Sequence, residues 1–288
     1  MISKIYSLKS WLLPSSVEEM ARRMIGSHWL GPQARGILRA NRDICQSHAG
    51  ESGYIIATGP SIAKQDLSPL TGKFCISVSN FFVHPLFEII KPAYHCVAPY
   101  HVPITEKAWQ VWMDDLASHN TNSRLVFSLS DYQRNLKHKR FDKDEKYFLA
   151  MGGPIAPLTP THLNLTRRLA GPQSVTIMAL YLALWVGLKK IYLIGCDHDW
   201  ILHAGESRHF YDESKHALNR EGYTEWHEAA ECTKLQLEFA CNARLWKQYQ
   251  AIRRLALSMG CEIYNMTEGG LLDVFPRVNL KSVVGTTI

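Results

Sequence analysis

Several features that would identify common classes of protein are missing from this chain of 288 residues. Its longest apolar segment, residues 177–188, is too short to span a membrane, and Lys189 follows it directly. The seven cysteines are scattered without a CxxC pair, which argues against a zinc ribbon. No GxxxxGK[ST] motif is present, so a P-loop NTPase is not expected. The first residues lack the apolar core of a signal peptide. With an odd number of cysteines, these absences favour a cytoplasmic protein with reduced thiols.

The composition is that of a globular protein, with 20% charged and 46% hydrophobic residues. Its length fits one large domain or two small ones. The formal net charge is +6, and basic side chains gather in four places. These are the N-terminal segment, residues 134–140, Lys189 with Lys190, and Arg253 with Arg254. Such groups could face phosphates or anionic lipids, or could simply be solvated. The N-terminal segment also carries Trp11, Leu12 and Leu13, so it could lie on a membrane surface or pack onto the domain.

Short apolar runs alternate with helical patterns along most of the chain. We predict six strands, at residues 54–58, 74–79, 94–98, 124–128, 190–195 and 261–265. Helices are predicted at residues 174–187 and across 225–259, the latter as one helix or two. The pattern predicts an α/β fold, Rossmann-like and doubly wound, with a mostly parallel sheet. We expect a helical N-terminal extension over residues 1–50 and a catalytic domain over 51–288, with a lid-like insertion at about 198–230.

Ligands of doubly wound sheets bind beyond the carboxyl ends of the strands, so the residues at these ends are the first candidates. Thr58, Gly59, Pro60 and Ser61 follow the first predicted strand, where glycine permits close approach and serine could donate to a phosphate. An ordinary strand-to-helix turn would explain the same residues. Asn80 ends the second strand and could pair with a ribose or a base, or serve only in a turn.

The fifth predicted strand ends at Asp197 and Asp199, which flank His198. These residues could bind a metal or a sugar hydroxyl, or merely finish the strand. Ser174 is a good N-cap for the helix at 174–187, preceded by Gln173, and the free amides of its first turn could bind an anion. Arg168, close before this turn, could bind the same phosphate or be solvated.

The segment from 198 to 230 is rich in histidine. His209 and Tyr211 stand beside the aromatic Phe210, in the kind of loop that closes over substrates, and His227 follows further along. Histidine is the natural general base for activating a hydroxyl group. The spacing does not decide which histidine serves.

In their order and spacing, these strand-end motifs resemble a family of bacterial glycosyltransferases. The stretches at 55–62, 77–82 and 174–197 are similar to the sialyltransferases of glycosyltransferase family 42. They are similar also to the lipopolysaccharide Kdo transferases and to the motility accessory factor proteins. The resemblance covers residues 53–275, and the stretch at 208–213 is similar to a motif of the lipopolysaccharide branch.

The resemblance implies an inverting transfer of an acidic sugar, of the sialic acid or Kdo type, from a CMP-activated donor to a hydroxyl of a bacterial surface glycan. It places residues 58–61, Asn80 and Ser174 at the donor. The two phosphate-binding tyrosines of the family correspond to Asp199 or Trp200 and to His209 or Tyr211, which is a departure from its pattern. The family's catalytic histidine precedes the helix that leads into the last strand. The equivalent position in this chain falls near Ala243, which is not a base, and His227 is the nearest replacement.

The resemblance implies no required cofactor and no metal site, although Mg²⁺ could bind. We expect a glycan or glycolipid acceptor and no nucleic acid; the chain could form a homo-oligomer and could work at the inner face of the cytoplasmic membrane. Two alternatives remain. One is an ATP-dependent enzyme similar to a pterin diphosphokinase, with the acidic residues near 197 as a metal site. The other is a nucleotide-binding protein of polysaccharide assembly without catalysis.

Overall fold

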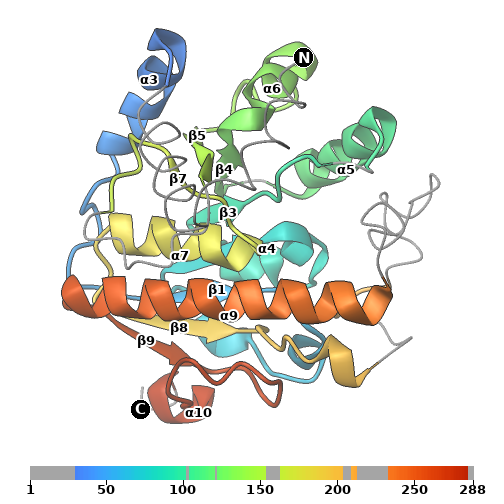
Figure 1. Ribbon diagram of the computed structural model, residues 1–288, viewed down its shortest axis with the longest axis vertical. Coiled ribbons are helices and arrows are strands. Elements are labelled where there is room, and N and C mark those ends of the chain that lie inside the picture. Colours follow the sequence, from blue (N-terminus) through green and yellow to red (C-terminus); the bar gives the residue numbers. More distant parts are fainter. Residues whose placement is uncertain are drawn as a thin grey trace, which may run out of the picture.

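The computed structural model describes residues 30–101, 104–120, 122–153, 163–203, 209–212 and 233–284. Seven strands form one sheet in the order β5-β4-β3-β2-β1-β8-β9, and every neighbouring pair is parallel (Figure 1). They are β1 (Ser52–Ile56), β2 (Cys75–Val78), β3 (Tyr94–Cys96), β4 (Arg124–Ser128), β5 (Lys146–Leu149), β8 (Lys190–Ile194) and β9 (Glu262–Asn265). A separate pair joins β6 (Met151–Gly153) and β7 (Leu169–Ala170). The predicted α/β, doubly wound, Rossmann-like sheet is confirmed.

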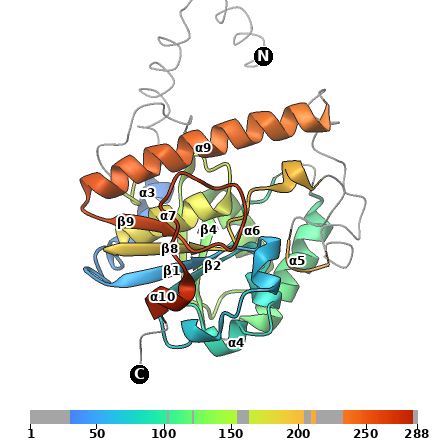
Figure 2. The ribbon, with the colours of Figure 1, turned by 90° about the horizontal axis from the view of Figure 1, so that it is seen from below.

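Helices cover both faces of the sheet, so the fold has three layers (Figures 1 and 2). The helices are α3 (Pro32–Leu38), α4 (Phe87–Ile90), α5 (Glu106–His119), α6 (Tyr132–His138), α7 (Val175–Trp185), α9 (Lys234–Ser258) and α10 (Leu280–Val284). Apolar residues of α7 and α9 form one core with one face of the sheet, while α4, α5 and α10 form a second core with the other face.

The strands are apolar on both faces because each face is covered. In β1, Ile55 belongs to the core under α7, whereas its neighbours Tyr54 and Ile56 belong to the opposite core. This arrangement explains why the strands read as apolar runs rather than as an alternation of apolar and polar residues. The helix α7 lies between the sheet and α9, and its residues 176–184 are all buried. A helix in that position is apolar on every side.

All six predicted strands are present, most of them a residue or two shorter than the apolar runs. Three strands were not predicted from the sequence: β5, which follows a highly charged stretch, and the short strands β6 and β7. The helix predicted across 225–259 is continuous over Lys234–Ser258, and residues 225–232 lie outside the described part. No helix among the described residues is long and apolar enough to cross a membrane.

The predicted N-terminal extension is described only from residue 30 onward. Its helix α3 is followed by a 3₁₀ turn at Arg39–Arg42 and by further turns up to residue 50. The Asn41 side chain donates to the Phe148 and Leu165 carbonyls at 2.8 Å each. The backbone amides of Gln46 and His48 donate to the carbonyls of Trp185 and Val186, at the C-terminal end of α7. The described part of this segment therefore packs against the sheet domain.

Candidate functional site

The order in which successive strands are added to the sheet reverses between β1 and β8. Successive strands run from β1 outward to β5, and the chain then returns to place β8 and β9 on the other side of β1. Loops that leave β1 and β8 diverge at such a switch point and leave a crevice at the carboxyl ends of the strands. The crevice holds a cavity of about 520 Å³. Its walls include residues 57–61 after β1, 173–176 at the start of α7, Gly195 and 197–200 after β8, and Glu268, Gly269 and Gly270 after β9.

The turn after β1 is tied to the end of β8 by one carboxylate. Ser61 donates its backbone N–H to Asp197 Oδ1 at 3.0 Å and its hydroxyl to Asp197 Oδ2 at 2.9 Å. A Cβ atom on Gly59 would lie 1.8 Å from Asp197 Oδ2, so glycine is required there. Burial raises the pKa of Asp197, and the two hydrogen bonds from Ser61 oppose that rise. Asp197 therefore holds the two strand ends together at the base of the cavity.

A second close approach brings the loop after β9 against the same residue. Gly270 has a φ of +69°, and a Cβ atom there would lie 2.5 Å from the Asp197 carbonyl oxygen. The next amide, Leu271 N–H, donates to that oxygen at 2.8 Å. Three loops, after β1, β8 and β9, thus meet at Asp197.

The helix α7 begins at the cavity wall. Ser174 is its N-cap, and the Ser174 hydroxyl accepts a hydrogen bond from Thr176 N–H at 3.2 Å. Gln248 of α9 fixes the preceding turn, because it accepts from Gln173 N–H and donates to the Gly171 carbonyl, both at 2.7 Å. The positive end of the helix dipole therefore faces the cavity. Gln173 and Ser174 line the cavity, so an anion bound in it could contact the start of the helix.

A short described stretch of the predicted lid, residues 209–212, lies over the turn after β1. The His209 Nδ1 atom is 3.1 Å from Thr58 Oγ1, and Phe210 N–H donates to the Thr58 carbonyl at 3.1 Å. The His209 ring stacks on Tyr211 with a centroid separation of 5.0 Å. His209 lines the cavity, whereas Tyr211 lies behind it. His227, the other catalytic candidate, is outside the described residues.

Asn80 hydrogen-bonds to the stretch at residues 209–212. Its Nδ2 donates to the Tyr211 hydroxyl at 2.7 Å, and its Oδ1 accepts from Trp112 Nε1 at 2.6 Å. Both ends of the Asn80 amide therefore contact protein groups, and Asn80 does not line the cavity.

The structure brings most of the predicted donor-binding residues together. Those in the cavity wall are Thr58, Gly59, Pro60, Ser61, Gln173, Ser174, Asp197 and Asp199. Arg168 is exposed on the surface and does not line the cavity. The Asp199 Oδ2 atom lies 3.6 Å from His203 Nε2 at the cavity wall. Within the described ranges, no group of three or more His, Cys, Asp or Glu side chains is arranged to hold a metal ion.

His198, which also lines the cavity, was considered from the sequence only together with Asp197 and Asp199, as part of a possible site for a metal or a sugar hydroxyl. His198 is 7% exposed, and its Nε2 atom lies 2.7 Å from the Tyr249 hydroxyl on α9. Its Nδ1 atom is buried without a hydrogen-bond partner among the described residues. Burial lowers the pKa of His198 to about 4. The sequence shows a histidine between two aspartates, but nothing in it predicts contact with a tyrosine 51 residues later.

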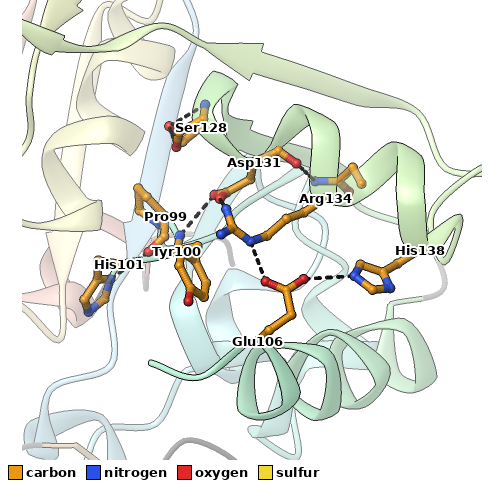
Figure 3. A network of polar contacts seen from close by, with 10 residues as sticks. Pro99, Tyr100, His101, Glu106, Ser128, Asp131, Arg134 and His138 are labelled. Atoms are coloured by element: carbon orange, nitrogen blue, oxygen red, sulfur yellow. Dashed lines mark hydrogen bonds and ion pairs between the residues drawn. The ribbon is translucent and has the colours of Figure 1, made fainter. Parts of the chain in front are cut away.

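Further along the same edge of the sheet, polar side chains form a closed network after β3 and β4 (Figure 3). The buried Asp131 accepts from Tyr100 N–H at 3.1 Å and from Arg134 Nη1 at 3.5 Å. The Arg134 guanidinium lies 3.5 Å from the centre of the Tyr100 ring and donates to Glu106 at 3.0 Å. Glu106 also pairs with His138 Nε2 at 3.0 Å. The network fixes the loop after β3, but it does not line the cavity.

No protein-family model matches the chain, and no curated protein shows a significant match. Solved structures that are similar to it include the sialyltransferase CstII from Campylobacter jejuni in complex with a substrate analogue, cytidine-5'-monophosphate (CMP). It is 14% identical, with a TM-score of 0.46, over 80% of this chain and 85% of that one. CstII with a trisaccharide acceptor and CMP is 13% identical, with a TM-score of 0.40, over 79% and 86%. These structures are sialyltransferases, as are members of the family that the sequence motifs resemble. At such TM-scores the likeness carries no argument. The strand order gives the fold, and the cavity marks the candidate site.

Proposed function

We propose that the chain is a glycosyltransferase that moves an acidic sugar, of the sialic acid or Kdo type, from a CMP-activated donor to a hydroxyl group of a bacterial surface glycan. The observation that carries the proposal is the switch-point cavity, because the capped start of α7 and the turn after β1 both line it. Its volume of about 520 Å³ falls within the range of small-molecule sites. CMP is named in the solved sialyltransferases, at a similarity too low to support the proposal by itself.

The start of α7 is suited to the phosphate of the donor. Its first-turn amides and its dipole favour negative charge, which grows on the phosphate oxygen as the bond to the sugar breaks. The Ser174 hydroxyl and the Gln173 side chain stand at the same wall. We assign the phosphate to this end of the cavity and the nucleoside to the part that residues 195–200 enclose.

The transfer itself is a displacement at the anomeric carbon. The acceptor oxygen forms a bond to this carbon, the bond to the CMP phosphate breaks, and its electron pair leaves with CMP. A base removes the proton of the acceptor hydroxyl. His209 is the candidate base in the described cavity wall, where Thr58 and the Tyr211 ring orient it. His227 remains the second candidate for this role. In this scheme Tyr211 acts only by orienting His209. The Tyr211 hydroxyl accepts a hydrogen bond from Asn80, and Tyr211 does not line the cavity.

The same proposal leads to expectations about the acceptor and about where in the cell the enzyme acts. We expect a glycan or glycolipid acceptor of lipopolysaccharide or a related surface polymer. The basic N-terminal segment would contact an anionic membrane at its cytoplasmic face. We do not expect a metal ion to be essential, since the departing group is a monophosphate.

The proposal is tested by ligand binding and then by turnover. A ligand that binds only the folded state raises its melting temperature, so we expect CMP to stabilise the full chain more than CDP, UDP, GDP or ATP. Transfer from a CMP-sugar to a glycan acceptor is expected to continue in EDTA. Stabilisation by ATP only in the presence of Mg²⁺ would instead favour the pterin diphosphokinase alternative. CMP binding without transfer to any acceptor would favour the non-catalytic alternative.

A comparison of two variants tests the choice of base. His209→Ala should lower kcat strongly and leave the Kd for CMP within about threefold, because the base acts on the acceptor. His227→Ala should show that pattern instead if His227 is the base. Unchanged kcat in both variants would contradict the proposal that either histidine removes the proton.

A further inference from the structure

His198 forms part of the cavity wall, and the proposed chemistry gives its side chain no role. Its ring is enclosed by three aromatic side chains. The centroids of Trp200, Tyr249 and Trp246 lie 5.4, 5.5 and 6.1 Å from that of His198. Only 7% of the residue is exposed, and His198 is one of the residues that line the cavity. The ring is therefore held in one place beside the cavity.

One of the two ring nitrogens is used by the protein and the other is not. Nε2 lies 2.7 Å from the Tyr249 hydroxyl, which itself interacts with the Ser174 and Thr176 side chains at the start of α7. Nδ1 is buried and has no hydrogen-bond partner among the described residues. A buried polar atom without a partner destabilises a folded protein, so such atoms are rare and call for an explanation.

His95 provides a comparison inside the same molecule. It is fully buried, its Nδ1 lies 2.8 Å from Ser77 Oγ, and its Nε2 has no partner among the described residues. Its ring packs against Phe82 and Phe87 in the core under α4, and it does not line the cavity. No ligand in the cavity can reach His95, whereas the unpaired atom of His198 belongs to a residue in the cavity wall.

We propose that His198 Nδ1 hydrogen-bonds an uncharged group of the bound nucleoside, either a ribose hydroxyl or the polar edge of the base, and that Tyr249 positions the ring for this contact. The inference rests on the proposed function, because it takes the ligand to be a CMP-sugar. It adds to that function a residue that selects the nucleoside.

Charge explains why the partner is the nucleoside and not the phosphate. Carboxylates precede and follow His198 in the cavity wall, at Asp197 and Asp199, and they disfavour an anion beside it. Burial keeps the pKa of His198 at about 4, so the imidazole is uncharged at neutral pH. A neutral ring nitrogen suits a hydroxyl or a base edge, whereas the start of α7 offers the phosphate a positive potential.

Two substitutions separate the two ring nitrogens. His198→Asn places a hydrogen-bonding atom where Nδ1 stands and loses the contact with Tyr249. His198→Gln places one where Nε2 stands and loses the contact with the cavity. The residue has a φ of +51°, a conformation that asparagine accepts more easily than glutamine. The melting temperature of each variant is therefore measured first, and binding is measured well below it.

The experiment is calorimetric titration of the full chain with CMP and with cytidine. We expect His198→Gln to weaken both by about 3- to 10-fold, the loss typical of one buried hydrogen bond. His198→Asn should stay within about threefold of the wild type. Tyr249→Phe should weaken CMP by about twofold. His95→Gln, the matched control, should lower the melting temperature and leave the Kd for CMP of the folded protein unchanged.

A second measurement does not depend on any variant folding. In the protein labelled with ¹⁵N in histidine, adding CMP should shift the Nδ1 resonance of His198 and leave that of His95 unchanged. If the wild type binds CMP and His198→Gln binds it equally, or if the His198 resonance does not move, this inference is overturned while the proposed function stands. A loss for CMP without a matching loss for cytidine would overturn the assignment to the nucleoside. Failure of the wild type to bind CMP would overturn the proposed function and this inference with it.

Discussion

Two polar regions lie at the carboxyl edge of the same sheet, and they differ in what their side chains contact. After β3 and β4, Asp131, Arg134, Glu106 and His138 pair with one another (Figure 3). At the switch point, the buried Nδ1 of His198 has no partner among the described residues, and the start of α7 lies in the cavity wall. A network whose groups satisfy one another braces a loop. A cavity wall with unsatisfied groups is prepared for a ligand. The comparison therefore assigns structure to the first region and binding to the second.

The largest difference between the regions should come from Gly59→Ala. The new Cβ atom would lie 1.8 Å from Asp197 Oδ2 and would separate the turn after β1 from the end of β8. We expect a loss of about 1–3 kcal/mol in the free energy of unfolding and a Kd for CMP at least about tenfold higher. Chemical denaturation and calorimetric titration measure the two effects. In the control, Gly36→Ala, nothing outside the helix lies within 4 Å of the new methyl group. Because Gly36 lies within α3, this change should leave the Kd for CMP near wild type and raise the free energy of unfolding by up to about 1 kcal/mol.

The second prediction concerns pH and the closed network. Burial raises the pKa of Asp131 to about 6, from 3.8, although Tyr100 N–H and Arg134 oppose the rise. The native state thus holds this proton more tightly than the unfolded state. The stability that results is fully present below pH 3.8 and is lost as the pH rises through about 6. Asp131→Asn does not titrate. Its free energy of unfolding relative to wild type should therefore rise by about 1–3 kcal/mol between pH 4 and pH 7.

Denaturation of both proteins across this pH range measures the difference, and the Kd of Asp131→Asn for CMP should match that of the wild type at pH 7. A difference in stability that does not change with pH would show that Asp131 titrates as it does in the unfolded chain. A change in CMP affinity would contradict the assignment of this network to structure alone.

The third prediction compares two helix caps, one in each region. Ser174 caps α7 at the cavity, and Thr105 caps α5 beside the network, where its hydroxyl accepts from Ala108 N–H at 3.1 Å. Replacing either with alanine should cost about 1 kcal/mol of stability. Only Ser174→Ala should also weaken CMP, by about 3- to 10-fold, because only α7 begins in the cavity wall. Equal CMP affinity in the two variants would contradict the assignment of the phosphate to the start of α7.

The smallest effect is expected from Arg134→Lys. Lysine keeps the charge near Glu106 but loses the flat guanidinium above the Tyr100 ring. Because the Arg134 side chain is partly exposed, the loss should be below about 1 kcal/mol, with no change in the Kd for CMP. Thermal denaturation with and without CMP gives both values, and a smaller stabilisation by CMP than in wild type would be the contrary result.

The sequence predicted the fold better than it predicted the contacts of the site. Apolar runs between polar strand ends were enough to predict β1, β2, β3, β4, β8 and β9. The strand β5 was missed because charged residues precede it and it has only one neighbour in the sheet. The rule for strand ends brought Thr58, Ser61, Ser174 and Asp197 to one cavity, as the structure has them.

Contacts between segments far apart in the sequence could not be predicted in this way. Ser61 and Asp197 are 136 residues apart, and no spacing rule pairs them. Asn80 was expected to contact the nucleotide, but its amide contacts Trp112 and Tyr211, which depends on how α5 and residues 209–212 pack. The unpaired nitrogen of His198 arises because α9 brings Tyr249 to the other side of the ring.

The most direct test of the central claim is hydrogen exchange of the full chain with and without CMP, read out by mass spectrometry. Binding at the switch point predicts slower exchange in residues 57–64, 173–177 and 195–203. It predicts no change in residues 99–101 and 128–138, where the Arg134 network lies. Protection confined to the network segments, or no protection anywhere at saturating CMP, would contradict the claim that the cavity between β1 and β8 is the nucleotide site.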